Sequence, residues 1–305
     1  MSILVLGSLN MDLVARVDQL PKPGETRIGQ SFETIPGGKG ANQAVAAAKL
    51  GAPTQMIGRV GSDEFGDTLR QGLSAIGVTV DTVSTDPATP SGVALITVAQ
   101  TGENQIIVVP GANHCVDDME LSALSAQLSK AQALLLQFEI PHAVVVAAAK
   151  LAHQAGVPVI VDPAPARLAL SPDFYTHIDI LTPNQVEVAQ LVGFEVCDRK
   201  TAAQAAQILR QRGVRTVIVK LGGQGVVVDT QATCFEIPAF SVEVVDTVAA
   251  GDAFNGGLAA ALAEGQSLKD AVTFASAVAA LSVTRPGAQP SMPSRTEVDQ
   301  FLQQA

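Results

Sequence analysis

Short apolar runs recur along the chain and predict the strands of a buried β-sheet. The runs are rich in Val, Leu, Ile and Ala and cover residues 3–6, 133–139, 157–162, 178–182 and 216–220. Stretches with helical periodicity, at 143–155 and 202–212, separate several of these runs. Strands that alternate with helices form parallel sheets that are covered on both faces. We therefore predict an α/β fold with a mostly parallel central sheet and helices on both sides.

Two segments interrupt this alternation with β patterns alone. Residues 13–36 contain the β segments Leu13–Val17 and Thr26–Ile35, and a hairpin pattern returns at 92–98 and 104–109. We expect these inserts to pair into a small sheet that projects from the main domain as a lid. The lid is then made of residues 13–36 and 90–111, and the α/β core of residues 1–12, 37–89 and 112–305.

Residues 246–257 mark the point where a β-rich run gives way to a helix of small residues. The preceding run, Phe240–Val245, alternates like a strand. The helix is predicted from Ala250 to Glu264, because Gly265 suits the position after a helix C-terminus. A strand that turns into a helix within a few residues presents the free N–H groups of the helix N-terminus at the edge of the sheet.

The residues of this turn support two interpretations. Ala249, Ala250 and Gly251 are small enough to let an anion approach their backbone N–H groups. Asp252 follows in the first helical turn, where it could act as general base toward a hydroxyl while the N–H groups stabilise a transferring phosphoryl group. Alternatively, Asp252 only complements the helix dipole and Gly256–Gly257 are packing residues. The stretch alone leaves both open.

Composition narrows the range of partners. The formal net charge of −10 argues against nucleic acid or an anionic membrane, since both require a basic surface. A phosphate-bearing ligand must then be held by local groups. Hydrophobic residues make up 47% of the 305 residues, with no Trp and a single Tyr, so the core must be built from Val, Leu, Ile and Ala. That composition suits strands buried on both faces.

The cysteines and the apolar runs indicate the compartment. Cys115, Cys197 and Cys234 have neither paired spacing nor metal-ligand spacing, which is typical of a reducing environment. The N-terminus has no basic leader, and the longest apolar run, 143–149, is too short to span a bilayer. We expect a cytoplasmic protein with no membrane partner.

Candidate ligand-binding residues follow the ends of the predicted strands. No Gly-x-Gly-x-x-Gly or Gly-x-x-x-x-Gly-Lys-Ser/Thr motif occurs, so neither a Rossmann dehydrogenase nor a P-loop enzyme is supported. The polar residues at these ends are Asn10, Asp12, Glu139, Asp162, Asn184, Glu187, Lys220, Asp246 and Asp252. Open α/β sheets bind ligands at the carboxyl ends of their strands, so we predict a site there. Asn184 could instead be a turn residue after Pro183.

Residues 37–43, Gly-Gly-Lys-Gly-Ala-Asn-Gln, open a predicted helix that runs from Ala41 to about Leu50. Dense glycines let the backbone approach a ligand closely, and Lys39 and Asn42 could then bind the hydroxyls of a sugar. Alternatively, the segment is a hinge between lid and core with a solvated Lys39.

Two motifs resemble signatures of the ribokinase family of carbohydrate kinases. Residues 246–252, Asp-Thr-Val-Ala-Ala-Gly-Asp, resemble the family's Asp-Thr-x-Gly-Ala-Gly-Asp, with Ala249 in place of the first glycine, and residues 37–43 resemble a second signature. The resemblance extends over essentially the whole chain. It implies a ribokinase-like fold and transfer of the ATP γ-phosphoryl group to the 5-hydroxyl of D-ribose, giving D-ribose 5-phosphate and ADP. Another acceptor, such as fructose or adenosine, and a non-catalytic sugar or nucleotide sensor are the alternatives.

The resemblance also implies roles for individual residues. Asp252 is the implied general base, and Ala249, Ala250 and Gly251 form the anion hole. The implied sugar site comprises Asn10, Asp12, Gly38, Lys39, Gly40, Asn42, Glu139 and Asp252. The implied nucleotide site comprises Asn184, Lys220, Leu221, Gly222, Gly223, Gln224, Gly225, Gly251 and Ser276. A glycine hairpin without a ligand is the alternative for residues 220–225.

Two positions differ from the family pattern, and the resemblance also implies metal-binding residues. Ser276 stands where Asn or His is common, so we expect apolar packing against adenine, and Lys220 stands where Thr or Ser is common. Asn184 and Glu187 are the implied water-mediated Mg²⁺ residues. The implied K⁺ ligands are Asp246, Val248, Ser282, Arg285, Gly287 and Ser291. The resemblance further implies a homodimer formed through the β lid.

Overall fold

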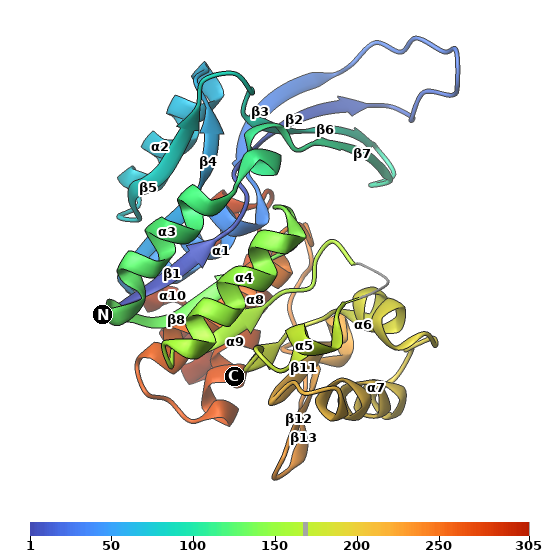
Figure 1. Cartoon of the computed structure of the whole chain (residues 1–305). Coiled ribbons are helices and arrows are strands. Elements are labelled where there is room, and N and C mark those ends of the chain that lie inside the picture. The colour runs from blue at the N-terminus through green and yellow to red at the C-terminus, as the bar shows by residue number, and fades with distance from the viewer. Residues whose placement is uncertain (167–169, 305) are drawn as a thin grey trace.

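The computed structural model describes residues 1–166 and 170–304, and its larger sheet is mostly parallel (Figure 1). Within these residues the sheet has nine strands in the order β13-β12-β11-β10-β9-β8-β1-β4-β5. Their bounds are β1 Ser2–Leu6, β4 Thr54–Gly61, β5 Thr79–Asp86, β8 Ala131–Leu136, β9 Val159–Val161, β10 Ile180–Leu181, β11 Thr216–Lys220, β12 Val226–Thr230 and β13 Cys234–Ile237. In this order, all neighbouring strands between β11 and β5 pair in parallel. Strands β12 and β13 add an antiparallel edge next to β11. The predicted α/β sheet is confirmed.

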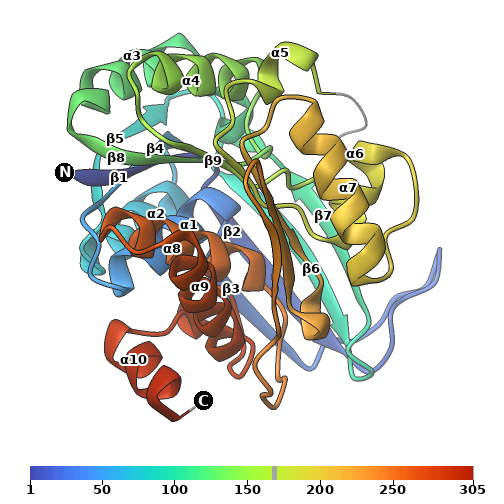
Figure 2. The same ribbon diagram turned by 90° about the horizontal axis from the view of Figure 1, so that it is seen from below.

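Helices cover both faces of this sheet (Figure 2). One face carries α1 Lys39–Lys49, α2 Glu64–Ala75, α8 Ala250–Ala263 and α9 Leu268–Ser282, with α10 Arg295–Gln304 outside them. The other face carries α3 Asp118–Gln127, α4 His142–Gln154, α5 Pro172–Tyr175, α6 Gln185–Val192 and α7 Arg199–Gln211. No helix within the described residues has the length and apolar character needed to cross a bilayer.

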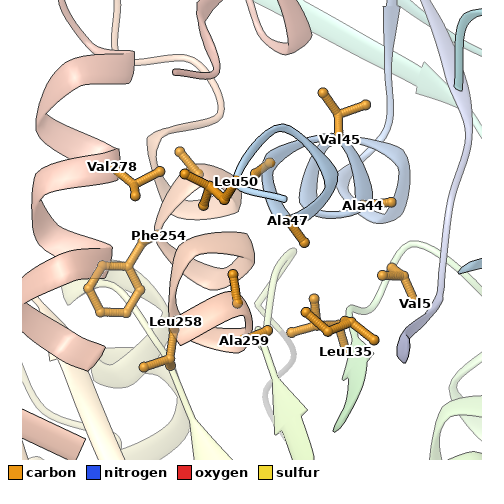
Figure 3. Close-up of a cluster of buried hydrophobic side chains, with 14 of the residues drawn as sticks. Val5, Ala44, Val45, Ala47, Leu50, Leu135, Phe254, Leu258, Ala259 and Val278 are labelled. Atoms are coloured by element: carbon orange, nitrogen blue, oxygen red, sulfur yellow. The ribbon is translucent and has the colours of Figure 1, made fainter. Parts of the chain in front are cut away.

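Strand β1 shows how the apolar runs serve both faces. Ile3 and Val5 belong to the core cluster under α1 and α8, whereas Leu4 and Leu6 belong to the cluster under α3 and α4. Successive side chains of a strand point to opposite faces, so a strand covered on both sides must be apolar at every position. Figure 3 shows the first cluster, in which Val5 lies near residues of α1 and α8.

A second, four-stranded sheet has the order β3-β2-β6-β7 and projects from the core (Figure 1). Its strands are β2 Asn10–Val17, β3 Ser31–Gly37, β6 Gly92–Ala99 and β7 Asn104–Val109. The central pair β2–β6 is parallel and joins the two inserts, so the predicted pairing of the inserts is confirmed. The first strand begins earlier than predicted, at Asn10, and the second begins later, at Ser31. The residue bounds given for lid and core remain a prediction.

The strand predicted at Phe240–Val245 is wrong. After β13 the chain runs as irregular backbone up to Ala249. The N–H groups of Val245 and Asp246 both donate to the carbonyl of Val283, at 2.8 and 3.2 Å, instead of to a neighbouring strand. Alternating apolar residues suffice for a strand only where a sheet edge can pair with them. Here Val244 and Val245 are mostly exposed.

The following helix, by contrast, ends as predicted. Helix α8 runs from Ala250 to Ala263, with Glu264 as its C-cap, and Gly265 adopts a positive φ of 82°. It packs closely against α1 because Gly256 has no side chain. A Cβ atom on Gly256 would lie 2.5 Å from Ala46 Cβ and 2.8 Å from the carbonyl oxygen of Gln43. Gly256 is therefore a packing residue that sets the approach of the two helices.

We expect Gly256→Ala to destabilise the protein by about 1–3 kcal/mol, because the added methyl group must push α1 and α8 apart. Gly72, in the interior of α2, is a matched control, since nothing lies within 4 Å of the Cβ it would gain. Gly72→Ala should stabilise the helix by about 0.5–1 kcal/mol. Urea unfolding of both variants measures the difference. Equal effects would show that the helix approach does not depend on Gly256.

Candidate active site

A cavity of about 790 Å³ lies at the carboxyl ends of the central strands. Asp162 follows β9, Asn184 follows β10 and Lys220 ends β11, and all three line the cavity. The N-terminal ends of α1 and α8 contribute Lys39 and Asp252. The sheet topology thus brings five of the nine predicted strand-end residues to one cavity, because Glu187 lines it as well. Among the described residues, Asn10, Asp12, Glu139 and Asp246 are not part of this lining.

Asp252 lies in the first turn of α8 and is 4% exposed. Asn42 Nδ2 donates to its Oδ2 at 3.0 Å, and Gln43 Nε2 donates to its Oδ1 at 3.0 Å. Burial raises the pKa of Asp252 to about 6, while Lys39 opposes the rise and Asp162 adds to it. A carboxylate with this pKa is ionised at neutral pH but is a stronger base than an exposed aspartate.

The backbone before Asp252 offers hydrogen-bond donors to an anion. Ala249 is the N-cap of α8 and has no side-chain cap, so the first N–H groups of the helix need other partners. Ala250 N–H donates to the carbonyl of Thr247 at a long 3.3 Å. Within the described residues, the N–H groups of Ala249 and Gly251 donate to no group outside the helix. The anion hole predicted at these residues therefore keeps two free donors and a weakly bound third.

Ala249 adopts the left-handed conformation, with φ 58° and ψ 13°. It is the only residue other than glycine with a positive φ in residues 1–166 and 170–304. An L-residue pays about 1–2 kcal/mol for this conformation, which glycine adopts freely. The left-handed backbone explains why this position of the signature favours glycine, and it turns the chain into α8.

Lys220 places a cation beside these amides. Its Nζ lies 3.1 Å from Asp162 Oδ1 and 3.1 Å from the point where a Cβ atom on Gly251 would be. The ammonium group is thus held next to the N-terminus of α8, inside the same cavity. Asp162 was noted in the sequence only as a strand end and received no role. Its charge partner, 58 residues away in the sequence, was not predictable from spacing.

The predicted sugar residues lie where the lid meets the core. Burial raises the pKa of Asp12 to about 7, and the carboxylates of Glu139 and Asp252 add to the rise. Asn10 Oδ1 accepts a hydrogen bond from Asn113 Nδ2 at 2.7 Å, a partner that the sequence did not indicate. Asn42 Oδ1 is buried and has no hydrogen-bond partner within the described residues. This acceptor is therefore unsatisfied, although Asn42 is not among the described residues that line the cavity.

The start of α1 is tied to neighbouring backbone. Gly38 has a φ of 89°, and a Cβ atom there would lie 2.7 Å from the backbone N of Asn10. A Cβ atom on Gly40 would lie 2.7 Å from the backbone N of Ser8. The two glycines therefore let α1 approach the turn after β1. Glu139 fixes the same corner, because it accepts hydrogen bonds from the backbone N–H of Lys39 at 3.0 Å and from the Ser8 hydroxyl.

Lys39 lines the cavity instead of extending into solvent. Burial alone would lower the pKa of its ammonium group, but the carboxylates around it hold that pKa above its ordinary value; they are Asp252, Glu139, Asp162 and Glu187. Lys39 is therefore a permanent cation in a cavity rich in carboxylates. The interpretation of the segment as a hinge between lid and core stays a prediction.

The predicted nucleotide loop has only part of its residues on the cavity. Gly222, Gly223 and Gly225 line it, and the short helix η3 Gly222–Gln224 shapes the turn. Leu221 is 2% exposed and packs in the core. The Gln224 side chain donates to the carbonyl of Cys197 at 3.2 Å, away from the cavity lining.

Asn184 and Glu187 form a capping box at the start of α6. Asn184 Oδ1 accepts from Glu187 N–H at 2.9 Å, and both oxygens of the Glu187 carboxylate accept from Asn184, at 2.8 Å each. Burial, with Asp162 adding to it, raises the pKa of Glu187 above its ordinary value. Both residues also line the cavity, so the interpretation of Asn184 as a turn residue and the ligand-site interpretation are compatible.

Ser276 lies on an apolar wall of the cavity. Its hydroxyl donates to the carbonyl of Val272 in its own helix at 2.8 Å, so it is not directed at a ligand. The wall also contains Phe240, Val242, Val244, Ala279, Ala280 and Val283. The apolar packing against adenine that we expect at position 276 stays a prediction.

Part of the predicted K⁺ set converges on Asp246. Its Oδ1 accepts from Val248 N–H at 3.0 Å and its Oδ2 accepts from Gly287 N–H at 2.9 Å. The Ser282 and Ser291 hydroxyls donate to the carbonyls of residues 279 and 288. Arg285 pairs through its side chain with Glu297, so only its backbone could bind a cation. Within the described residues, no hydrogen bond links Ser291 to Asp246.

Comparison with known proteins places these features in a family. Residues 1–295 match the model of the pfkB family of carbohydrate kinases. The ribokinases of Haemophilus influenzae and Bacillus subtilis are each 42% identical to this chain, over 100% and 99% of it respectively and over 99% of their own length. A solved structure of Arabidopsis thaliana ribokinase, complexed with ribose and ATP, has a TM-score of 0.91 at 36% identity, covering 99% of this chain and 98% of the other. The chain belongs to the pfkB family of carbohydrate kinases.

Proposed function

We propose that the protein phosphorylates the 5-hydroxyl of D-ribose with ATP, giving D-ribose 5-phosphate and ADP. The observation that carries the proposal is the buried Asp252 carboxylate, which accepts a hydrogen bond on each oxygen. Just before it in the chain, the N–H groups of Ala249 and Gly251 have no acceptor among the described residues. Full-length similarity to ribokinases and to a ribokinase complexed with ribose and ATP supports the choice of substrates.

In this reaction Asp252 accepts the proton of the acceptor hydroxyl as its oxygen attacks the γ-phosphorus. The N–H groups of Ala249 and Gly251 stabilise the negative charge that spreads over the phosphoryl oxygens, because they are fixed by the helix before the reaction. The Lys220 ammonium beside Gly251 adds a positive charge at the same point. The lid residues exclude water, which would otherwise compete with the sugar as acceptor.

The residues at the lid side provide the sugar site. Asn42 Oδ1 is a buried acceptor without a partner among the described residues, and it would accept a hydrogen bond from a sugar hydroxyl. Asp12 and Lys39 provide a carboxyl group and a cation nearby. A sugar that satisfies these groups binds in preference to one that leaves them unpaired.

The cofactor residues fit Mg²⁺ bound through water. Both Glu187 oxygens are already engaged by Asn184, which leaves this carboxylate one lone pair on each oxygen for water molecules around an ion. Mg²⁺ on the triphosphate would neutralise its charge during transfer. Each oxygen of Asp246 likewise accepts a single N–H, and this carboxylate with nearby backbone carbonyls would hold K⁺ and stiffen the turn before α8.

An ADP-release assay tests the proposal directly. We expect turnover with D-ribose to exceed that with fructose or adenosine, and turnover to fall when Na⁺ replaces K⁺. Preferred use of another acceptor would reassign the substrate, and absence of ADP release with every sugar would favour a sugar or nucleotide sensor. The control is the rate of ADP release without sugar, which measures transfer of the phosphoryl group to water.

We expect Asp252→Asn to lower kcat by at least about 10²-fold while ATP affinity stays close to that of the wild type, since the amide cannot accept the proton. In the wild type, kcat/KM should fall as the pH drops through about 6, because protonation of Asp252 removes the base. Calorimetric ATP binding and a pH–rate profile measure the two effects. Near-normal turnover of the variant would eliminate Asp252 as the base.

We further propose that the protein forms a homodimer through the lid and acts in the cytoplasm, where ATP is made. Strand β7 is an unpaired edge, and Ile106 and Ile107 are 54% and 63% exposed on its two faces. Apolar residues at an open edge call for a covering partner. The double variant Ile106→Lys with Ile107→Lys should sediment as a monomer. Met119→Lys, at an equally exposed residue of α3, is the control, and a monomeric wild type would refute the proposal.

A further inference from the structure

Gln43 occupies a central place in the site although its position in the motif suggested no role for it. It lies on α1 and has no exposed surface. Its Nε2 donates to Asp252 Oδ1 at 3.0 Å and to Asp162 Oδ2 at 3.1 Å. One amide nitrogen has two hydrogens, so Gln43 can satisfy one oxygen of each carboxylate at once.

A second buried amide fixes the orientation of the first. Gln137, which follows β8, donates from its Nε2 to Gln43 Oε1 at 2.7 Å. Because the Gln43 oxygen is held there, its NH₂ group must face the two carboxylates. Gln137 Oε1 is buried and has no hydrogen-bond partner among the described residues. It fits there because residue 7 is glycine, since a Cβ atom on Gly7 would lie 2.0 Å from this oxygen. An unsatisfied buried acceptor lowers the stability of the folded protein. The pairing of Gln137 with Gln43 is therefore not explained by stability alone.

The hydrogen bonds continue beyond Asp162 to the nucleotide end of the cavity. The other oxygen of Asp162, Oδ1, accepts from Lys220 Nζ at 3.1 Å. The chain of contacts therefore runs from Lys220 through Asp162 and Gln43 to Asp252. Without Gln43 two buried carboxylates would face each other with no donor between them, a pairing that favours a shared proton.

We propose that Gln43 is the positioning residue of the general base. Its amide fixes the orientation of the Asp252 carboxylate through Oδ1 and keeps Asp252 and Asp162 separately ionised. Gln137 acts through Gln43 by fixing the direction of its amide. The inference rests on the proposed function, because it takes Asp252 to be the base.

The charge state of Asp252 is the property that this role should change. The charged and titratable groups facing it are Lys39 from α1, Asp162 after β9 and Asp12 from β2, with Lys220 beyond Asp162. A hydrogen bond donated to a carboxylate stabilises its ionised form. Loss of the Gln43 donor should therefore move the protonation of Asp252 to higher pH, whereas a change in packing alone would not.

The test replaces Gln43 by Met, which keeps the length of the side chain without its donor. We expect kcat to fall by about 10–100-fold, because the base is no longer aligned with the acceptor hydroxyl. KM for ATP should change less than about threefold, and the acid limb of the pH–rate profile should move up by about half a unit to one unit. A fall in kcat with an unmoved acid limb would show that Gln43 only fills space, and would overturn the proposal.

Gln137→Met provides an independent variant, since Gln137 does not contact Asp252. It should shift the acid limb in the same direction by a smaller amount, and this result remains informative if Gln43→Met does not fold. Gln55→Met is the matched control, because it removes a side-chain amide that donates to Thr82 of β5, the edge strand of the central sheet. Its acid limb and kcat should match the wild type.

Two failures are distinguishable. If Asp252→Asn keeps its turnover, the proposed function fails, and the role of Gln43 fails with it. If Asp252→Asn is inactive but both Gln43→Met and Gln137→Met keep the wild-type kcat and acid limb, only the positioning role is refuted.

Discussion

The close approach of α1 to α8 is the constraint on which the site depends. Gly256 lets the helices meet with backbone against backbone, and a methyl group there would clash with Ala46 and with the carbonyl of Gln43. The same approach brings the amides of Asn42 and Gln43 onto the carboxylate of Asp252. Gln43 thus takes part in both the packing and the site, because its carbonyl oxygen lies against Gly256 and its side-chain amide donates to Asp252.

Electrostatics explain why this cavity can hold several carboxylates. Asp252, Asp162 and Glu187 would repel one another in an apolar site, and burial would drive protons onto them. Lys39 and Lys220, which both line the cavity, offset that charge. The net charge of the whole chain is −10, so the proposed binding of a triphosphate would depend on these local cations and on the amides of α8.

The sequence predicted well those features that repeat locally. Strand β11 has the predicted bounds, and α8 ends where Gly265 indicated, because periodicity and a C-terminal glycine are encoded within a few residues. The strand at Phe240–Val245 failed for the opposite reason: its pattern was correct, but whether a sheet edge is available depends on the whole fold. Sequence patterns thus predict an element, and topology decides whether it forms.

The hydrogen-bond network of the site lay beyond such reasoning. Gln43 is 209 residues from Asp252 in the sequence and 94 residues from Gln137, its other partner. A glutamine does not by itself indicate a buried polar network. Asn184 and Glu187 show a related difficulty, since one spacing serves both a capping box and a ligand site. Strand ends predict which carboxylates gather at the sheet edge. They do not distinguish the proposed base Asp252 from Asp162, because the hydrogen-bond donors on each carboxylate oxygen come from side chains of other elements.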